Sequence, residues 1–412
     1  MKLRIIAIGD ELLIGQTTDT NSGYLARTLD RFGWELDRVT IIPDNHDEII
    51  ETIKQEFIDC DVIITSGGLG PTRDDITKKA LLEVFGGELR RDDNVTLNIK
   101  KIFERRNRKL NELTLDQALV PTSCEVIQND HGTAPIMLFR KGSKTLVSLP
   151  GVPSEFEHGW SEKVFPVLRE LYPSDYAIER RSFIVKGITE SALAQLLASF
   201  EDSLPSYLHL AYLPQKSYIR LRIDGRYGDS EHLEKILEQK TEQLKHTIGS
   251  YLLAEGDLSP VEILFHLLGK QKLTVATAES CTGGSISSSI TAVAGSSSYF
   301  KGGVVAYSNE VKQTVLGVGT STLQTYGAVS EQTVTEMLSG IRRITGSDCA
   351  IATSGIAGPG GGSKEKPVGT VCIGIATPQR TCVETVHFSG SRGFIVTQTV
   401  VTALMRLIDM LK

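Results

Sequence analysis

The 412-residue sequence has few cysteines, and none of them forms a metal or disulfide motif. The six occur singly, without a C-x-x-C pair or a His/Cys ligand spacing, which excludes the common zinc folds and disulfide scaffolds. No apolar run of about 18 residues predicts a membrane span, and Met1-Lys2 leads into a strand-like run without a signal peptide. We therefore expect a cytoplasmic protein with no membrane partner.

The sequence also lacks the excess of positive charge typical of proteins that bind nucleic acid in bulk. Its formal net charge is −6. A local basic cluster on a predicted helix consists of Lys100, Lys101, Arg105, Arg106, Arg108 and Lys109. No aromatic platform accompanies it, so we interpret it as a solvated face and expect no nucleic acid partner. No repeat, heptad array or low-complexity tail indicates a scaffold protein.

Histidines are scarce and scattered, which disfavours a Ser-His-Asp triad. The chain has eight, and none partners a Gly-x-Ser-x-Gly elbow. A content of 40% hydrophobic and 23% charged residues is typical of a globular protein. At about 100–200 residues per domain, the length predicts two to four domains.

A strand-turn-helix pattern is the strongest chemical signal that is present. Residues 273–278 form a near-apolar run that leads directly into 279–284, and the small residues 285–294 predict a helix. Such a turn exposes a hydroxyl beside backbone N–H groups at a positive helix end, so Ser280 is the candidate nucleophile. The alternative is that Ser280 caps the helix.

A serine nucleophile needs a base, and Lys312 is the best candidate. It follows the short apolar run 304–306 and so is predicted near another strand end. A lysine with its ordinary pKa of about 10.4 is protonated and useless as a base unless burial or a nearby cation lowers that pKa. The alternative is an ordinary surface lysine.

A glycine-rich loop at 354–362 follows the strand-like segment 349–353. Glycine allows backbone N–H groups to turn onto a phosphate at close range, although the same composition describes a flexible loop.

The N-terminal part alternates strands and helices. Strands are predicted at 3–8, 36–42 and 62–65, and helices at 21–32 and 47–58. This alternation predicts a parallel sheet with helices on both faces and ligands at the carboxyl ends of its strands.

Two loops follow strands of this predicted sheet, at 9–11 and 66–75. The second joins glycines that suit a phosphate with carboxylates that suit a hard divalent cation. The alternative is an acidic start to a helix at 76–85.

The middle of the chain predicts a small α+β module with the order strand, helix, two strands, helix. Its elements follow a helix at 154–171 and are predicted at 182–185, 190–200, 208–213, 218–223 and 232–248. The order resembles a KH-like unit without its RNA-binding Gly-x-x-Gly clamp, which favours a spacer or dimer contact. A linker at 254–260 ends in Ser259-Pro260, a helix N-cap followed by proline.

Five segments, 278–284, 307–310, 327–330, 354–359 and 366–370, together resemble the CinA family of competence/damage-inducible proteins. The resemblance implies an α/β chain of three domains. These are a molybdopterin-binding-like three-layer domain at 1–170, a KH-like α+β domain at 175–253 and an α/β deamidase domain at 257–412. The resemblance also implies that the protein assembles as a homodimer.

For the C-terminal domain, the resemblance implies hydrolysis of the amide of nicotinamide mononucleotide to nicotinic acid mononucleotide and ammonia, without a cofactor. Position by position it assigns catalysis to Ser280, Lys312 and Tyr307. It places substrate contacts at Ser297, Thr282, Gly283, Gly284, Ser354, Gly355, Arg392 and Gln398. We expect the backbone around 282–284 to hold the oxyanion. Cys281 is a rival nucleophile if the helix end lowers its pKa.

For the N-terminal domain, the resemblance implies metal-dependent ADP-ribose pyrophosphatase activity with Mg, Mn or Co. The implied metal ligands are Asp10, Glu11, Asp74 and Asp75. The implied nucleotide contacts are Gly67, Gly68, Gly70, Thr72, Asn129, Gly132 and Thr133. Two positions depart from the family pattern, since Ile136 replaces an expected glycine and His131 a small aliphatic residue. Alternatives are a deamidase fused to an inert nucleotide-binding domain, and a non-catalytic competence or damage-response adaptor.

Overall fold

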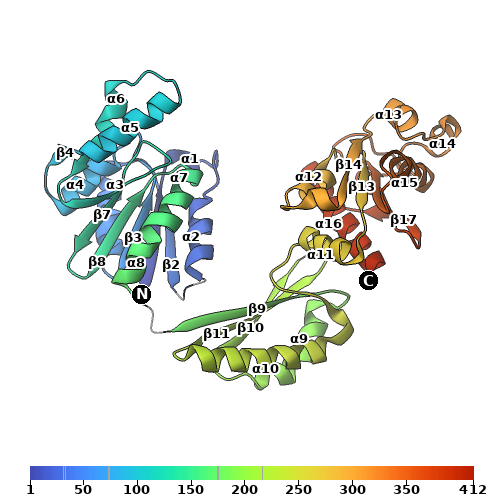
Figure 1. Ribbon diagram of the computed structural model, residues 1–412, viewed down its shortest axis with the longest axis horizontal. Coiled ribbons are helices and arrows are strands. Elements are labelled where there is room, and N and C mark those ends of the chain that lie inside the picture. Colours follow the sequence, from blue (N-terminus) through green and yellow to red (C-terminus); the bar gives the residue numbers. More distant parts are fainter. Residues whose placement is uncertain (31, 33, 73–74, 174–175, 216) are drawn as a thin grey trace. The chain divides into compact units, whose positions relative to one another are not determined.

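The computed structural model describes residues 1–30, 32, 34–72, 75–173, 176–215 and 217–412. It separates into two compact units. The first holds residues 1–179, 206–208 and 224–239, and the second holds 180–205, 209–223 and 240–412. Within the described ranges, three sheets of four or more strands form the framework (Figure 1).

The N-terminal sheet has six strands in the order β2-β1-β3-β8-β7-β6. Its parallel strands are β1 (Lys2–Ile8), β2 (Glu35–Ile42), β3 (Val62–Ser66) and β8 (Lys144–Leu149), and its antiparallel strands are β7 (Ile136–Lys141) and β6 (Cys124–Ile127). The alternation of side chains along β1 sends Leu3 and Ile5 into one core and Ile6 and Ile8 into another.

Helices cover both faces of this sheet, which confirms the predicted three-layer architecture. One core contains residues of α2 (Asn21–Asp30), α7 (Pro153–His158) and α8 (Phe165–Leu171), and the other contains residues of α3 (His46–Glu56) and α4 (Thr77–Phe85). The remaining elements are α1 (Asp10–Leu13), β4 (Leu89–Arg91), α5 (Asp93–Arg105), α6 (Glu112–Leu115) and β5 (Leu119–Pro121).

The predicted helix at 154–171 is present but changes its pitch midway. A π-helical segment, Gly159–Val164, joins α7 to α8. Gly159 allows a close approach to the sheet, because a Cβ there would lie 2.7 Å from Cδ1 of Ile136. Ile136 is fully buried in that core, so the departure from the family pattern serves packing.

The middle module is the predicted KH-like α+β unit. Its sheet has the order β10-β11-β9-β12. The elements are β9 (Ala177–Val185), α9 (Glu190–Asp202), β10 (Leu208–Pro214), β11 (Ile219–Tyr227), α10 (Ser230–Ile248) and β12 (Leu252–Glu255). The linker predicted at 254–260 therefore begins inside a strand, because β12 pairs with β9 and the N–H of Gly256 donates to the carbonyl of Ser182.

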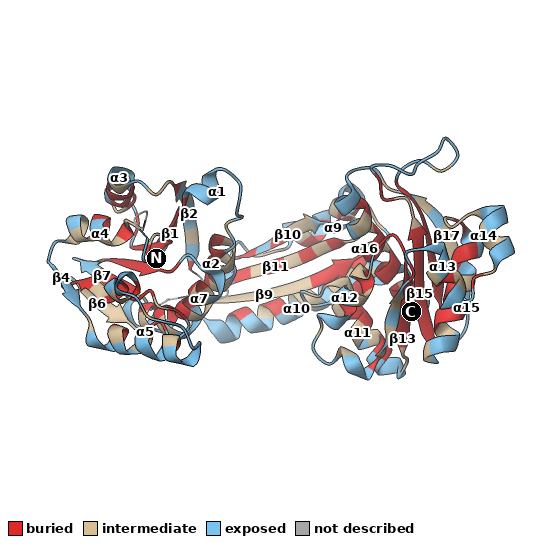
Figure 2. Cartoon of the chain, turned by 90° about the horizontal axis from the view of Figure 1, so that it is seen from above, coloured by how far each residue is buried: buried red, intermediate tan, exposed pale blue. Residues whose placement is uncertain are grey.

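The C-terminal sheet has five strands in the order β14-β13-β15-β16-β17. Its strands β13 (Val275–Glu279), β14 (Phe300–Val305) and β15 (Cys349–Gly355) are parallel, whereas β16 (Thr370–Ala376) and β17 (Thr381–His387) are antiparallel. Figure 2 shows β13 and β15 as buried.

Helices again form a layer on each face of this sheet. One core joins α11 (Pro260–Gln271), α12 (Ser285–Thr291) and α16 (Arg392–Leu411) to the sheet, and the other contains residues of α14 (Thr320–Tyr326) and α15 (Glu331–Thr345). Ser259 is the N-cap of α11 and Pro260 follows it, as predicted, and Glu262 completes a capping box that was not predicted. The short helix α13 (Asn309–Thr314) follows β14.

By length and composition, α16 could cross a membrane. It has 20 residues and a mean hydropathy of 1.5, but 56% of its apolar window is buried inside the structure. A single helix of this kind is weak evidence, and its contacts with α11 and β16 are those of a core helix. Its apolar residues are interrupted by Thr397, Gln398 and Thr399, so the sequence has no continuous apolar run there.

Candidate functional site

Ser280 stands in the turn between β13 and α12, at the carboxyl edge of the parallel strands. Its N–H donates to the carbonyl of Thr353 on β15, at 2.9 Å. Positive φ angles at Gly283 and Gly284 allow the chain to reverse before α12 begins. Gly284 is the N-cap residue of α12 and makes no side-chain cap. Ser280 is therefore not the helix cap, which was the alternative interpretation.

Glu279 performs the capping instead. Its fully buried carboxylate accepts hydrogen bonds from the N–H groups of Gly284 (3.1 Å), Ile286 (3.0 Å) and Ser287 (2.8 Å), and from the Ser287 hydroxyl (2.7 Å). A negative charge at the positive end of a helix is stabilising. Glu279 stands six residues before Ser285, where the predicted helix begins, so capping rules that consider the residue next to the helix do not identify this role.

Lys312 is the buried partner of Ser280. It lies on α13, whose N-terminus is capped by the Ser308 hydroxyl. Its side chain is 1% exposed, and its Nζ lies 2.9 Å from Ser280 Oγ, 2.8 Å from the Ala306 carbonyl and 3.2 Å from the Tyr307 carbonyl. The surface-lysine alternative is therefore wrong. Burial lowers the pKa of Lys312 below its ordinary value.

The three partners of Lys312 Nζ would satisfy an ammonium, and they also suit a neutral amine. Such an amine has two N–H donors and one lone pair. The two carbonyl oxygens, of Ala306 and Tyr307, can accept its N–H groups, which directs the lone pair to the hydroxyl of Ser280. This is the arrangement that a general base requires, because the base must accept the hydroxyl proton.

A cavity of about 180 Å³ opens beside this pair. It is lined by Ser280, Cys281, Tyr307, Asn309, Lys312, Ala328, Val329, Ser354, Gly355, Ala357 and Arg392. Of the predicted residues, the structure thus brings together Ser280, Lys312, Tyr307, Ser354, Gly355 and Arg392. Asn309 begins α13, whereas Ala328, Val329 and Ala357 come from loops. These four were not predicted as site residues, because only the fold brings them to this edge.

Arg392 and Tyr307 meet at the cavity. The Arg392 guanidinium donates to the Tyr307 hydroxyl at 3.2 Å and to the Gly358 carbonyl at 2.9 Å. Both side chains are exposed, so their polar groups can contact solvent or a ligand. In contrast, the Ser354 hydroxyl already donates to the Ala328 carbonyl at 2.7 Å. Ser354 therefore contributes to the shape of the wall.

The predicted oxyanion donors need correction. The N–H of Gly283 donates to the Ser280 carbonyl at 3.1 Å, and that of Gly284 is taken by Glu279. Within the described part of the chain, the N–H groups of Cys281 and Thr282 have no such partner. An oxyanion near Ser280 would therefore find its donors at these two residues. The Thr282 side chain is buried against the Thr353 hydroxyl, away from the cavity lining.

The structure does not bring Ser297 or Gln398 into this cavity. Ser297 is exposed in a short turn, Ser296–Ser298, before β14 begins, so a whole strand of about 20 Å separates it from the edge that holds Ser280. Gln398 is half-buried on α16, beyond the cavity lining.

The expectation of a lowered pKa for Cys281 is wrong. The residue is 7% exposed, and burial raises the pKa of its thiol to about 12. A thiol that holds its proton at neutral pH is a poor nucleophile.

The N-terminal domain has a larger cavity, of about 520 Å³, at the carboxyl ends of β1, β3 and β8. Six predicted residues line it, namely Glu11, Gly67, Gly68, Gly70, Asp75 and Thr133. Asp44, Gln117 and Glu155 also line it and were missed. Asp44 and Glu155 follow strands β2 and β8, so the strand-end rule could have found them. Asp74 lies outside the described residues.

Several predicted residues shape this cavity through hydrogen bonds. Asp75 accepts hydrogen bonds from the N–H groups of Gly70 and Thr72 and from the Thr72 hydroxyl, which closes their loop. Asn129 is 2% exposed; its Oδ1 accepts from the N–H of Gly132, and its Nδ2 donates to Glu155 at 2.9 Å. Thr72, Asn129 and Gly132 are thus positioning residues.

Four carboxylates gather near this cavity, and the charges of Asp10, Glu11 and Asp75 act on Asp44. Burial raises the pKa of Asp44, and the charges of the other three raise it further. The N–H of Asp10 donates to Asp44 at 3.1 Å, which joins the loops after β1 and β2. Oxygen donors whose negative charges repel one another fit a hard divalent cation, which would neutralise them.

Comparisons with known proteins cover the whole chain. Three family descriptions match, namely "Probable molybdopterin binding domain" at residues 4–170, "Damage-inducible protein CinA KH domain" at 180–254 and "CinA C-terminal domain" at 258–411. A CinA-like protein of Cytophaga hutchinsonii is 40% identical over 94% of this chain and 93% of its own. A CinA-like protein of Flavobacterium psychrophilum is 39% identical over 98% and 97%.

A crystal structure of a competence or damage-inducible protein from Enterobacter asburiae matches with 39% identity and a TM-score of 0.36. It covers 37% of this chain and 96% of its own.

We predict that Glu279→Gln destabilises the C-terminal domain by about 1–3 kcal/mol, because an amide replaces a charged acceptor of several hydrogen bonds. Thermal unfolding of the full chain measures this. Glu310→Gln, an exposed change on α13, is the matched control. Equal unfolding curves for the two variants would contradict the capping role.

Proposed function

The chain belongs to the CinA family, and on that premise we propose that its C-terminal domain hydrolyses the amide of nicotinamide mononucleotide. The observation that carries the proposal is the 2.9 Å contact between the buried amine of Lys312 and the hydroxyl of Ser280. A non-catalytic adaptor has no need of a buried base beside a serine at a cavity. The products are nicotinic acid mononucleotide and ammonia.

In the first half of the reaction, Ser280 Oγ attacks the carboxamide carbon while its proton passes to Lys312 Nζ. The oxyanion lies against the N–H groups of Cys281 and Thr282. The C–N bond then breaks, and Lys312 returns the proton to the departing nitrogen, which leaves as ammonia. A water molecule hydrolyses the resulting ester, with Lys312 again accepting the proton and Ser280 recovering it.

The size and charge of the cavity favour one orientation of the substrate. A volume of about 180 Å³ is below the about 300–1,000 Å³ of pockets that enclose a drug-sized ligand, so we expect only the pyridine ring to enter. The ribose phosphate would remain at the mouth, where Arg392 supplies a cation and donors suited to phosphate.

For the N-terminal domain, we propose binding and metal-dependent hydrolysis of ADP-ribose. The cavity of about 520 Å³ is in the range that encloses a nucleotide-sized ligand. Asp10, Glu11, Asp44 and Asp75 would hold a divalent cation, which neutralises a diphosphate and lowers the pKa of water when bound. Of the glycines after β3, Gly68 would offer its backbone N–H to a phosphate, since those of Gly67 and Gly70 donate to the Leu149 carbonyl and to Asp75. The alternative is binding without turnover.

We predict that Ser280→Ala lowers the release of ammonia from nicotinamide mononucleotide by at least about 10³-fold, because the nucleophile is lost. Cys281→Ala should retain most activity, since its protonated thiol takes no part. The assay is ammonia release by the purified full chain. Loss of activity only in the cysteine variant would reverse the assignment.

A second prediction concerns pH. Because Lys312 must be neutral to accept a proton, kcat/KM should rise with pH and level off below about pH 10.4, the ordinary lysine pKa. Lys312→Arg should lose about 10²–10⁴-fold, because a guanidinium stays protonated. Lys301→Arg, an exposed change on β14, should behave as the unaltered protein. A kcat/KM that falls as the pH rises from neutral toward about 10.4 would exclude Lys312 as the base.

We further predict that Asp44→Asn lowers metal-dependent release of AMP from ADP-ribose at least about tenfold, because a charged ligand becomes neutral. Ammonia release from nicotinamide mononucleotide should be unchanged. Glu51→Gln, an exposed change on α3, is the control for charge alone. Unchanged AMP release by the Asp44 variant would remove this carboxylate from the metal site.

A further inference from the structure

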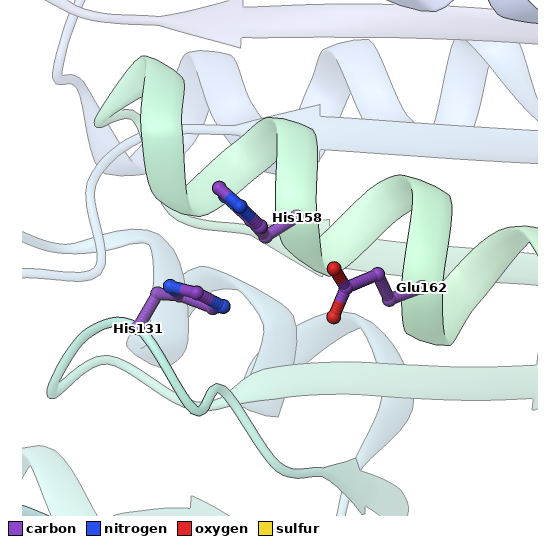
Figure 3. Close-up of side chains that lie close together, drawn as sticks. All are labelled: His131, His158 and Glu162. Atoms are coloured by element: carbon purple, nitrogen blue, oxygen red, sulfur yellow. The ribbon is translucent and has the colours of Figure 1, made fainter.

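A second group of potential metal ligands lies in the N-terminal domain, apart from the four carboxylates. It consists of His131, His158 and Glu162 (Figure 3). One ligand atom from each of the three side chains lies within 4.8 Å of the other two. His131 comes from the turn after β6, whereas the other two come from the helical segment after β8.

The hydrogen bonding of His158 prepares it as a ligand. Its Nδ1 lies 2.7 Å from the carbonyl oxygen of Ser154, which can only accept, so Nδ1 carries the proton. The lone pair of the neutral imidazole is then on Nε2. A backbone carbonyl that fixes the tautomer in this way is the usual outer partner of a metal-binding histidine.

The backbone places Glu162 and His131 next to His158. Glu162 lies four residues after His158, within the π-helical segment Gly159–Val164, and its carboxylate points toward the two rings (Figure 3). The His131 ring stacks on the His158 ring, with centroids 3.9 Å apart and planes inclined by 22°. The N–H of His131 donates to Asn129 Oδ1, which fixes the turn.

Two further contacts tie the His131 turn to the helix. The carboxylate of Asp130 pairs with Lys163 at 2.7 Å, and Asn129 Nδ2 donates to Glu155 at 2.9 Å. The salt bridge also reduces the repulsion between the charge of Lys163 and a metal cation bound nearby, because Asp130 carries the opposite charge. The backbone positions of the three ligands are therefore held by contacts that do not involve the ligand atoms.

We infer that His131, His158 and Glu162 bind a divalent transition-metal cation of the Zn²⁺ and Co²⁺ class. Imidazole nitrogens suit these borderline cations, whereas Mg²⁺ prefers an all-oxygen set such as the one near Asp44. Ligand atoms in a tetrahedral site stand about 3.4 Å apart at bonds of about 2.1 Å. The side chains are exposed or half-buried, so side-chain rotations that separate the stacked rings can bring the ligand atoms together.

Three protein ligands leave a coordination position open for water or a ligand. The location of the three ligands in the fold suggests what could occupy this open coordination position. Thr133 follows His131 by two residues and Glu155 precedes His158 by three, and both line the N-terminal cavity. The site is thus beside that cavity, where the cation could contact a phosphorylated ligand. The inference of this metal site does not depend on the proposed deamidase activity.

The test is a titration of the untagged, chelator-treated full chain with Co²⁺, followed by visible absorption, and competition with Zn²⁺. We expect one equivalent to produce a d–d band. The variant His131→Ala/His158→Ala should bind at least tenfold more weakly and lose the band, and Glu162→Gln should also weaken binding. His209→Ala, an exposed change on β10, and Asp44→Asn should leave the band unchanged.

Binding by exposed Cys382 would survive in the double variant, so that variant decides the question. An unaltered band and affinity there would overturn the proposal. Thermal unfolding of each variant checks folding. If the alanine variants are unfolded, His131→Gln/His158→Gln is used with the same expected loss, since glutamine keeps a polar side chain without an imidazole.

Discussion

The proposed chemistry depends on the burial of one amine. Lys312 is removed from water by α13 and by the edge of the C-terminal sheet, and its hydrogen bonds go to two carbonyls and the Ser280 hydroxyl. Within the described ranges, no carboxylate forms an ion pair with it. Desolvation without a counter-charge favours the neutral amine. The same burial that positions this side chain therefore also favours the unprotonated form that can accept the Ser280 proton.

In the turn between β13 and α12, the residues on either side of Ser280 have roles different from that of Ser280. Glu279 satisfies the first N–H groups of α12 from inside the core, so Ser280 does not have to cap the helix. Cys281 meanwhile is buried with a raised pKa. Three successive residues thus have different roles, because consecutive residues of a tight turn face different surroundings.

Both large domains place their cavities by the same geometric rule. In each, parallel strands end at one edge of a sheet covered by helices, and the loops that leave this edge carry the polar residues. The charged residues at the two sheet edges differ. The N-terminal edge gathers carboxylates whose charges repel one another, whereas the C-terminal edge gathers a lysine and an arginine. We therefore expect a cation to accompany the ligand at the first site and a ligand phosphate to bind directly at the second.

The sequence by itself determined the order of elements, the three-layer and KH-like architectures and the loops that form both cavities, because these follow from local periodicity, glycine turns and strand ends. It also indicated Ser280 and Lys312. Only the tertiary structure decided which side chains meet. It placed Ser297 at the opposite edge, gave capping to Glu279, set the pKa of Cys281 and joined His131 to His158. These side-chain positions, hydrogen bonds and pKa values depend on burial and on contacts between residues far apart in the sequence. Neither can be read from one segment of the chain.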